Sequence, residues 1–126
     1  MVATDSGRRM LQIAAAAAES KGGEDLVGLD VSEPLPLVDI FLLVTGRSER
    51  NVAAIADEIE DKLLESGFKR LRREGRSEAR WVLLDFGDLV VHVFHEDERV
   101  YYGLERLWKD CPVVPIELPE RVTPAP

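Results

Sequence analysis

Three polar side chains interrupt the apolar stretch of residues 81–95, and their types could do chemistry: Asp85, Asp88 and His92. Two nearby carboxylates could hold a divalent cation, as in nucleotidyl-transfer enzymes, where the metal positions and activates phosphate groups. That chemistry needs carboxylates aimed at one point, usually two residues apart on one strand with a third nearby. Asp85 and Asp88 are instead three residues apart, across a predicted turn. The spacing favours structural or partner-facing roles, with a metal-dependent nucleotidyltransferase-type enzyme as the alternative.

The histidines and the cysteine add no further candidate for catalysis. His92 and His95 are three residues apart on a predicted strand, so they point to opposite faces and cannot chelate one metal together. Cys111 is the only cysteine, and no evident base stands near it in the sequence to make it a nucleophile. A zinc site would need more ligands of these kinds. We therefore predict no catalytic residue, no metal and no cofactor.

The chain is acidic overall, with a formal net charge of −8. This charge disfavours a DNA-binding or general nucleic-acid-binding protein, whose affinity comes from neutralising phosphates. It favours a basic partner, which an acidic surface attracts over long range. The local exception is a basic cluster in residues 69–80, which consists of Lys69, Arg70, Arg72, Arg73, Arg76 and Arg80. These charges either protect an edge strand from pairing with neighbours or make a minor contact with RNA phosphate; the absence of interleaved aromatic residues favours the first.

Residues 81–95 also form the centre of the predicted fold. Two runs rich in Val, Leu and Phe flank Gly87 and Asp88, which predicts a β-hairpin over 80–86 and 89–95. Most positions of both runs are apolar, as in strands at the middle of a sheet covered by helices. Helical periodicity predicts helices over 4–21 and 48–66, and a short helix that opens at Glu96. Other strands are predicted over 26–31, at a sheet edge, over 37–45 and over 68–73.

This order of elements predicts an α/β sandwich, a single domain with a mixed five-stranded sheet and flanking helices. The predicted domain covers residues 1–111, and residues 112–126 form a proline-rich, weakly ordered C-terminal tail. No apolar run approaches the roughly 20 residues of a membrane span. The alanine run near the N-terminus is too short for an ordinary signal peptide, and a lone cysteine suits a reducing compartment. We expect a cytoplasmic protein without membrane attachment.

Several motifs resemble those of the ribosomal silencing factor family, also called Iojap-related. The resemblance covers about residues 8–111, and its strongest part is Trp-x-x-x-Asp-x-Gly-Asp-x-Val-Val-His from Trp81 onward, with Leu-Glu-x-Leu-Trp from Leu104. Other matching segments are Asp39-Ile40-Phe41, Thr45-Gly46-Arg47-Ser48, Ala54-Ile55-Ala56-Asp57 and Glu74-Gly75. The segments around Glu98 and Trp108 are similar to those of actinobacterial members. Asn51 departs from the pattern, since the family often has Gln there, which affects the expected contacts at a helix start.

The resemblance implies a nucleotidyltransferase-like fold that has lost the catalytic carboxylates, and therefore a protein that is not an enzyme. It implies binding to the large ribosomal subunit through ribosomal protein fourteen at the intersubunit face. Bound there, such a protein sterically blocks joining of the small subunit and represses translation under nutrient limitation. Members of the family are often dimers in isolation.

We predict that the partner-binding surface lies on the central hairpin, where polar residues stand among apolar ones. The predicted contacts are Trp81, Asp85, Asp88, Val90, His92 and Phe94. A hairpin this apolar needs cover when the protein is free of the ribosome, and a second copy of the same patch can supply it. The sequence therefore also predicts a weak homodimer that uses part of the ribosome-binding surface.

Overall fold

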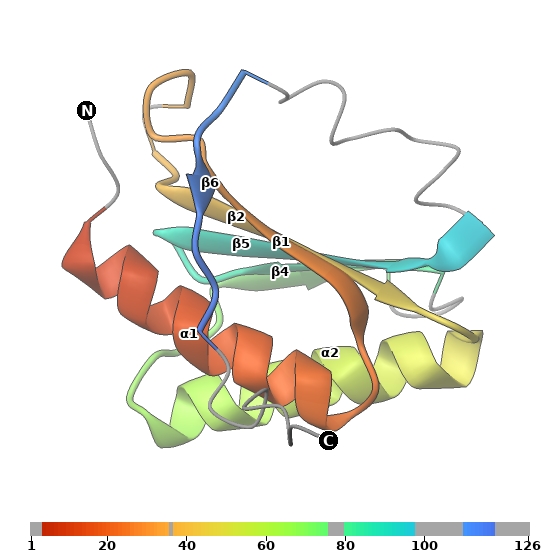
Figure 1. The fold of residues 1–126 in the computed structure, drawn as a ribbon. Coiled ribbons are helices and arrows are strands. Elements are labelled where there is room, and N and C mark those ends of the chain that lie inside the picture. Colours follow the sequence, from red (N-terminus) through yellow and green to blue (C-terminus); the bar gives the residue numbers. More distant parts are fainter. Residues whose placement is uncertain (1–3, 36, 76–79, 98–109, 118–126) are drawn as a thin grey trace, which may run out of the picture.

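Among the residues that the structure describes, the fold consists of one mixed β-sheet and two helices. The computed structural model describes residues 4–35, 37–75, 80–97 and 110–117. Both helices lie on the same side of the sheet (Figure 1). In chain order the elements are α1 (Asp5–Ser20), β1 (Glu24–Asp30), β2 (Ile40–Gly46), α2 (Glu49–Glu65), β3 (Arg72–Glu74), β4 (Trp81–Asp85), β5 (Leu89–His95) and β6 (Val113–Val114).

The sheet has the strand order β3-β4-β5-β2-β1-β6. β2 and β5 run parallel at its centre, with Ile40 opposite Leu89 and Gly46 opposite His95. The other neighbouring strands are antiparallel. All of β2 is buried, and so is β5 except for its last residue. The apolar character of residues 81–95 therefore has the expected cause, since strands at the centre of a sheet have little contact with water.

The helices cover one face of the sheet because each carries an apolar stripe. Ser48 caps α2, its side chain accepting a hydrogen bond from the Asn51 N–H at 3.0 Å, and Thr4 caps α1 through the Gly7 N–H in the same way. The buried residues of α2 recur at intervals of three and four: Val52, Ile55, Ala56, Ile59 and Leu63. They join α1 and the inward residues of the sheet in one core.

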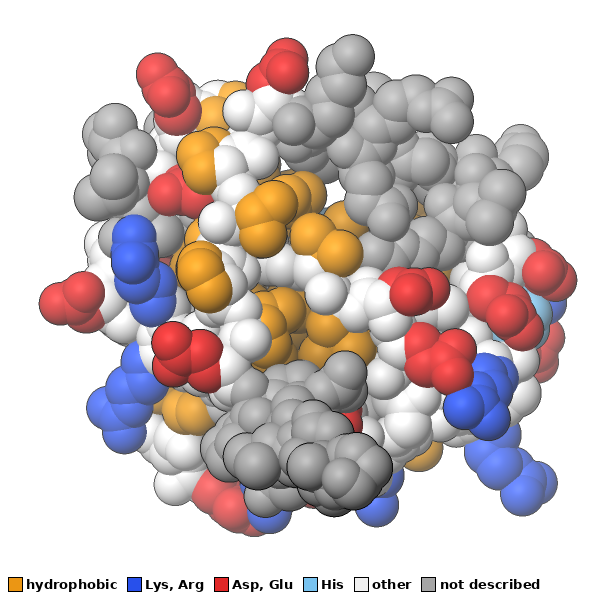
Figure 2. Space-filling view, viewed as in Figure 1, with side chains coloured by type: hydrophobic (Ala, Val, Ile, Leu, Met, Phe, Trp, Pro, Cys, Tyr) orange, Lys and Arg blue, Asp and Glu red, His pale blue; other side chains and the backbone are white. Residues whose placement is uncertain are grey.

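The opposite face of the sheet carries a second apolar cluster. Its buried members are Leu29, Val31, Phe41, Leu43, Val90 and Phe94, and Trp81 and Leu83 pack against it. Successive residues of a strand point to opposite faces, so every central strand contributes to both clusters. We call this second side the aromatic face, defined by Phe41, Trp81, His92 and Phe94. Figure 2 has the orientation of Figure 1, with α1, β1 and β6 in front rather than the aromatic face, and there hydrophobic side chains gather near the middle with charged ones around them.

The sheet has six strands rather than the five predicted. The sixth, β6, pairs Val114 with Gly28 and Val113 with Leu29, so β1 is not the edge strand that was predicted over 26–31. Two valines near Pro112 and Pro115 are too short a run to indicate a strand from local pattern. Gln12 of α1 holds the residues that follow β6. Its side-chain amide donates a hydrogen bond to the Pro115 carbonyl at 2.9 Å and accepts one from the Glu117 N–H at 2.8 Å.

Other predicted elements differ in extent or fall outside the description. The strand predicted over 68–73 is three residues long, Arg72–Glu74. The short helix predicted from Glu96 falls mostly on residues 98–109, which lie outside the described residues. The boundary between domain and tail at residue 111 stays a prediction, although β6 lies beyond it. Neither helix in the part of the chain described here has the length and hydropathy of a membrane span.

Candidate functional site

Four of the six residues predicted to contact a partner lie together on the aromatic face. Val90, His92 and Phe94 alternate along β5, and Trp81 is directly opposite Phe94 on β4. Asp85 lies on the same side of β4, opposite Val90, while Asp88 lies in the turn between the two strands. The hairpin register thus gathers the predicted apolar contacts in one patch and leaves the two carboxylates at its end.

The rings of this face are packed in a defined arrangement. Trp81 stacks on Phe94 with ring centroids 5.4 Å apart and an angle of 21° between the planes. The Trp81 indole N–H donates to His92 Nδ1 at 3.3 Å, and Phe41 meets the His92 ring edge-to-face at 4.8 Å. A stack and a hydrogen bond together hold the Trp81 ring in one orientation, which preorganises this ring for contact. Trp81 is partly exposed, whereas Phe41, His92 and Phe94 are buried.

His92 is the most unusual member of this group because it is a titratable side chain with only 6% of its surface exposed. Burial lowers the pKa of His92 to about 4, so the ring is neutral at pH 7. Since Nδ1 accepts from Trp81, the proton of the neutral ring is assigned to Nε2. Nε2 is buried and makes no hydrogen bond within the described part of the chain.

Asp85 and Asp88 both stabilise the turn, Asp85 through its carboxylate and Asp88 through its main chain. Asp85 accepts a hydrogen bond from the Gly87 N–H at 2.9 Å, which stabilises the tight connection, and Gly87 takes a φ of 91° there. The main-chain carbonyl of Asp88 accepts from the N–H groups of Asp39 and Ile40, each at 3.0 Å, and so fixes the turn to the start of β2. Within the described residues, no group of three or more His, Cys, Asp or Glu side chains could hold a metal ion.

Many charges of the basic cluster are paired with acids. The ion pairs are Arg70–Glu60 (2.8 Å), Arg73–Asp57 and Arg73–Glu60 (2.9 Å each), Arg80–Glu49 (3.3 Å) and Arg72–Glu74 (3.2 Å). Burial opposes the charge of Arg73, but the hydrogen bonds and charges of Asp57 and Glu60 outweigh that penalty and raise the pKa of Arg73. The helix acids are far from this cluster in sequence, so only the fold reveals that they neutralise it.

Cys111 packs at the margin of the aromatic face. Burial, followed by the negative charges of Asp30, Asp110 and Glu33, raises the pKa of its thiol. A raised pKa disfavours the thiolate, which is the nucleophilic form, and this agrees with the prediction that Cys111 is not a nucleophile.

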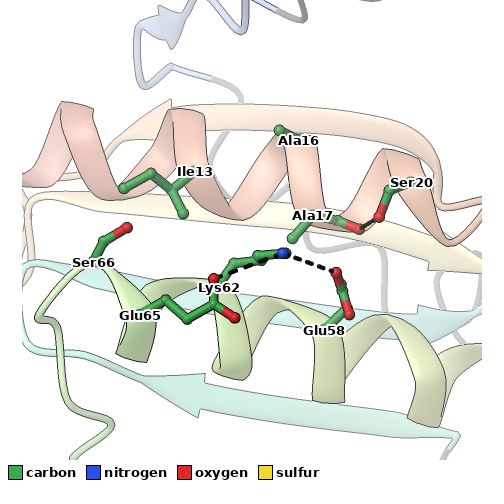
Figure 3. Close-up of a pocket in the computed structure, with 8 residues that line it drawn as sticks. All are labelled: Ile13, Ala16, Ala17, Ser20, Glu58, Lys62, Glu65 and Ser66. Carbon is green, nitrogen blue, oxygen red and sulfur yellow. Dashed lines mark hydrogen bonds and ion pairs between the residues drawn. The ribbon is translucent and has the colours of Figure 1, made fainter.

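Described residues line a groove on the helical side of the sheet and a smaller hollow on the other side. A groove of about 500 Å³ between α1 and α2 is lined on the α1 side by Ile13, Ala16, Ala17 and Ser20. On the α2 side, Lys62 pairs with both Glu58 and Glu65 (Figure 3). A smaller hollow of about 160 Å³ lies on the side of the sheet away from the helices, beside the aromatic face. It is lined by Glu74, Gly75, Trp81 and Leu83.

Sequence reasoning missed three residues of this region: Phe41, Glu74 and Leu83. Leu83 could have been found, because it is two positions from Trp81 on the same strand and so shares its face. Phe41 and Glu74 could not, since their placement depends on which strands are neighbours in the sheet.

The chain is similar to known proteins over most of its length. A family model described as "Ribosomal silencing factor during starvation" matches residues 4–125. A ribosomal silencing factor from Bacillus subtilis is 48% identical over 110 residues, which span 87% of this chain and 93% of the relative. A crystal structure from Bacillus halodurans has a TM-score of 0.77 at 45% identity, covering 86% of this chain and 99% of the other. A structure from Chromobacterium violaceum has a TM-score of 0.79 at 37% identity, covering 81% and 85% respectively.

Proposed function

Because the chain belongs to the ribosomal silencing factor family, we propose that it binds the large ribosomal subunit and blocks joining of the small subunit. Its direct partner on the subunit is ribosomal protein fourteen at the intersubunit face, and the outcome is repression of translation under nutrient limitation in the cytoplasm. The observation that carries this proposal is the family match over residues 4–125, which includes the whole described fold.

The aromatic face is the surface we assign to the partner. Its centre has the properties of an interface anchor: large rings, a fixed orientation and few charges. Trp81 is the partly exposed member of this group, and the buried side chains of Val90, His92 and Phe94 support it. Asp85 and Asp88 stand at the end of the group. The acidic charge of the whole chain, −8, supports a basic partner by raising the rate of encounter.

A contact with ribosomal RNA through the basic cluster is a minor part of the proposal. Arg70, Arg73 and Arg80 already pair with acids of α2, and exchanging those partners for phosphate gains little. Protein contacts through the aromatic face therefore contribute most of the affinity.

A binding role is favoured over the alternative of a metal-dependent nucleotidyltransferase-type enzyme. Asp85 is committed to the Gly87 N–H, and the main chain of Asp88 holds the turn against β2. Kinship of the fold with nucleotidyltransferases stays a prediction that follows from the family resemblance. The relatives carry the name of silencing factors, which describes a regulatory role.

Co-sedimentation with isolated ribosomal subunits tests the proposal. The protein is expected to pellet with large subunits at low and moderate salt, to leave small subunits unbound, and to reduce the fraction of joined ribosomes in a sucrose gradient. Absence of the protein from the large-subunit pellet at both salt concentrations would overturn the proposal. Metal-dependent nucleotide turnover that disappears in Asp85→Ala or Asp88→Ala would favour the enzyme instead.

The proposal includes a weak homodimer that covers part of the aromatic face when no ribosome is present. Trp81 and Leu83 are partly exposed apolar side chains of this face, and a twofold dimer covers them on both copies with one interface. Sedimentation velocity across a dilution series should show a mass that falls from dimer toward monomer. A cross-linked dimer should lose affinity for large subunits; a cross-linked dimer that binds them at full affinity would show that the two surfaces are separate.

A further inference from the structure

The small hollow beside the aromatic face has two apolar walls and one acidic wall. Trp81 and Leu83 come from β4, while Glu74 and Gly75 come from the end of β3 and the residue after it. Leu83 is directly opposite Glu74 in the β3–β4 pairing. Three of the four residues that line this hollow of about 160 Å³ therefore belong to paired strands.

Two contacts hold the Trp81 ring in place, and a close backbone approach fixes the position of Gly75. β5 lies on one side of β4 and β3 on the other, so Phe94 stacks on Trp81 from the side away from the hollow. The hydrogen bond from the Trp81 indole to His92 fixes the ring further. Gly75 has a φ of 81°, and a Cβ there would stand only 1.9 Å from the Trp81 carbonyl oxygen. The chain can pass this close to the start of β4 only with glycine.

The Glu74 carboxylate can exchange its present ion-pair partner for a new cation. Glu74 pairs with Arg72 at 3.2 Å, but the two side chains are 57% and 58% exposed. An ion pair this exposed contributes little in water, so an incoming cation that is better placed can replace Arg72. A carboxylate at one end of an apolar slot matches a side chain that has an apolar stem and a positive head.

We propose that this hollow is a subsite for one lysine or arginine side chain of the basic protein partner. The inference rests on the proposed function, which supplies that partner. The aliphatic stem lies against Leu83 and the Trp81 ring, and the charged head reaches the Glu74 carboxylate. A purely apolar side chain would gain nothing from the Glu74 carboxylate, so the subsite selects a basic residue over an apolar one.

Charge variants at Glu74 test this subsite against a matched control on the helical layer. Glu65 is also an exposed glutamate with a surface cation as partner, but it lies beside the α1–α2 groove. We expect Glu74→Lys to weaken large-subunit binding at least tenfold and Glu74→Gln about threefold, with a smaller salt dependence. Glu65→Lys and Glu65→Gln change the net charge by the same amounts and are expected to bind as the wild type does.

A second measurement needs no ribosome. The indole N–H signal of Trp81, assigned by its absence from Trp81→Phe, is followed by NMR during titration with N-acetyl-arginine methylamide or N-acetyl-norleucine methylamide. The arginine probe is expected to shift this signal more than the norleucine probe, and Glu74→Gln to remove the difference.

The outcomes separate the subsite from the function on which it rests. Equal binding of large subunits by wild type and both Glu74 variants, or equal shifts with both probes, would overturn the subsite and leave the proposed function standing. Failure of the wild type itself to bind large subunits would overturn both. Loss of binding in the Glu65 variants as well would show a general charge effect and would also overturn the subsite.

Discussion

Burial of His92 should make this protein less stable in acid. The imidazole ring is buried among Trp81, Phe41 and Phe94, and burial lowers its pKa from 6.5 to about 4. In the unfolded chain the same ring takes up a proton near pH 6.5. Between these two values the unfolded state binds more protons than the folded state, so the free energy of unfolding rises with pH in this window. The contribution of His92 to stability is thus complete above pH 6.5 and declines as the pH falls toward 4.

The size of the effect follows from the difference between the two pKa values. Each pH unit in the window changes the free energy of unfolding by roughly 1.4 kcal/mol, so a shift from pH 7 to pH 5 should remove about 2 kcal/mol. Other titrating groups also contribute to the measured change. Their contribution is the same in a variant that lacks only the imidazole, so the comparison between variant and wild type isolates His92.

Urea unfolding followed by circular dichroism at 222 nm, at pH 7 and pH 5, measures this difference. The wild type is expected to lose about 2 kcal/mol more than His92→Gln or His92→Phe, since neither replacement titrates in the window. The variants can differ from the wild type in absolute stability without affecting the test, because only the change with pH is compared. The same pH dependence in wild type and both variants would refute the reasoning and show that His92 is solvated or paired in the folded protein.

Three further predictions concern the aromatic face, the core and the turn at Gly75. Trp81→Ala should weaken large-subunit binding roughly thirtyfold, which corresponds to about 2 kcal/mol for a hot-spot ring; a variant that is folded by circular dichroism and binds normally would contradict this assignment. Leu42→Ala should lower the free energy of unfolding by about 2–5 kcal/mol because Leu42 is fully buried, whereas Leu37→Ala, at a residue 85% exposed, should change it little. Gly67→Ala should lower the free energy of unfolding by about 1–2 kcal/mol, because Gly67 has a φ of 93° with open space around it. Gly75→Ala, at a similar φ, should lower it clearly more, because the added Cβ meets the Trp81 carbonyl. Equal losses of unfolding free energy in urea for the two variants would contradict the close approach at Gly75.

Much of the fold could be predicted from the sequence because its signals are local. The helix predicted over 48–66 is observed as Glu49–Glu65, and its cap and buried stripe depend only on residues within a few positions of one another. The hairpin strands predicted over 80–86 and 89–95 are observed as Trp81–Asp85 and Leu89–His95, because Gly87 can take the positive φ that the turn needs. β6 was not predicted because two valines are too few to show a periodic pattern. They form a strand only through their pairing with β1.

The sequence by itself determined the family, the main helices and strands, and the grouping of Trp81, Val90, His92 and Phe94, since a hairpin register follows from its turn and from strand alternation. Only the tertiary structure decided what surrounds that group. Parallel pairing of β2 with β5 brings Phe41 onto His92, and the β3–β4 pairing sets Glu74 beside Leu83. The tertiary structure likewise places Arg70, Arg73 and Arg80 of the basic cluster in ion pairs with acidic side chains of α2. Contacts between distant segments depend on which strands become neighbours when the whole core is buried, and no local periodicity encodes that choice.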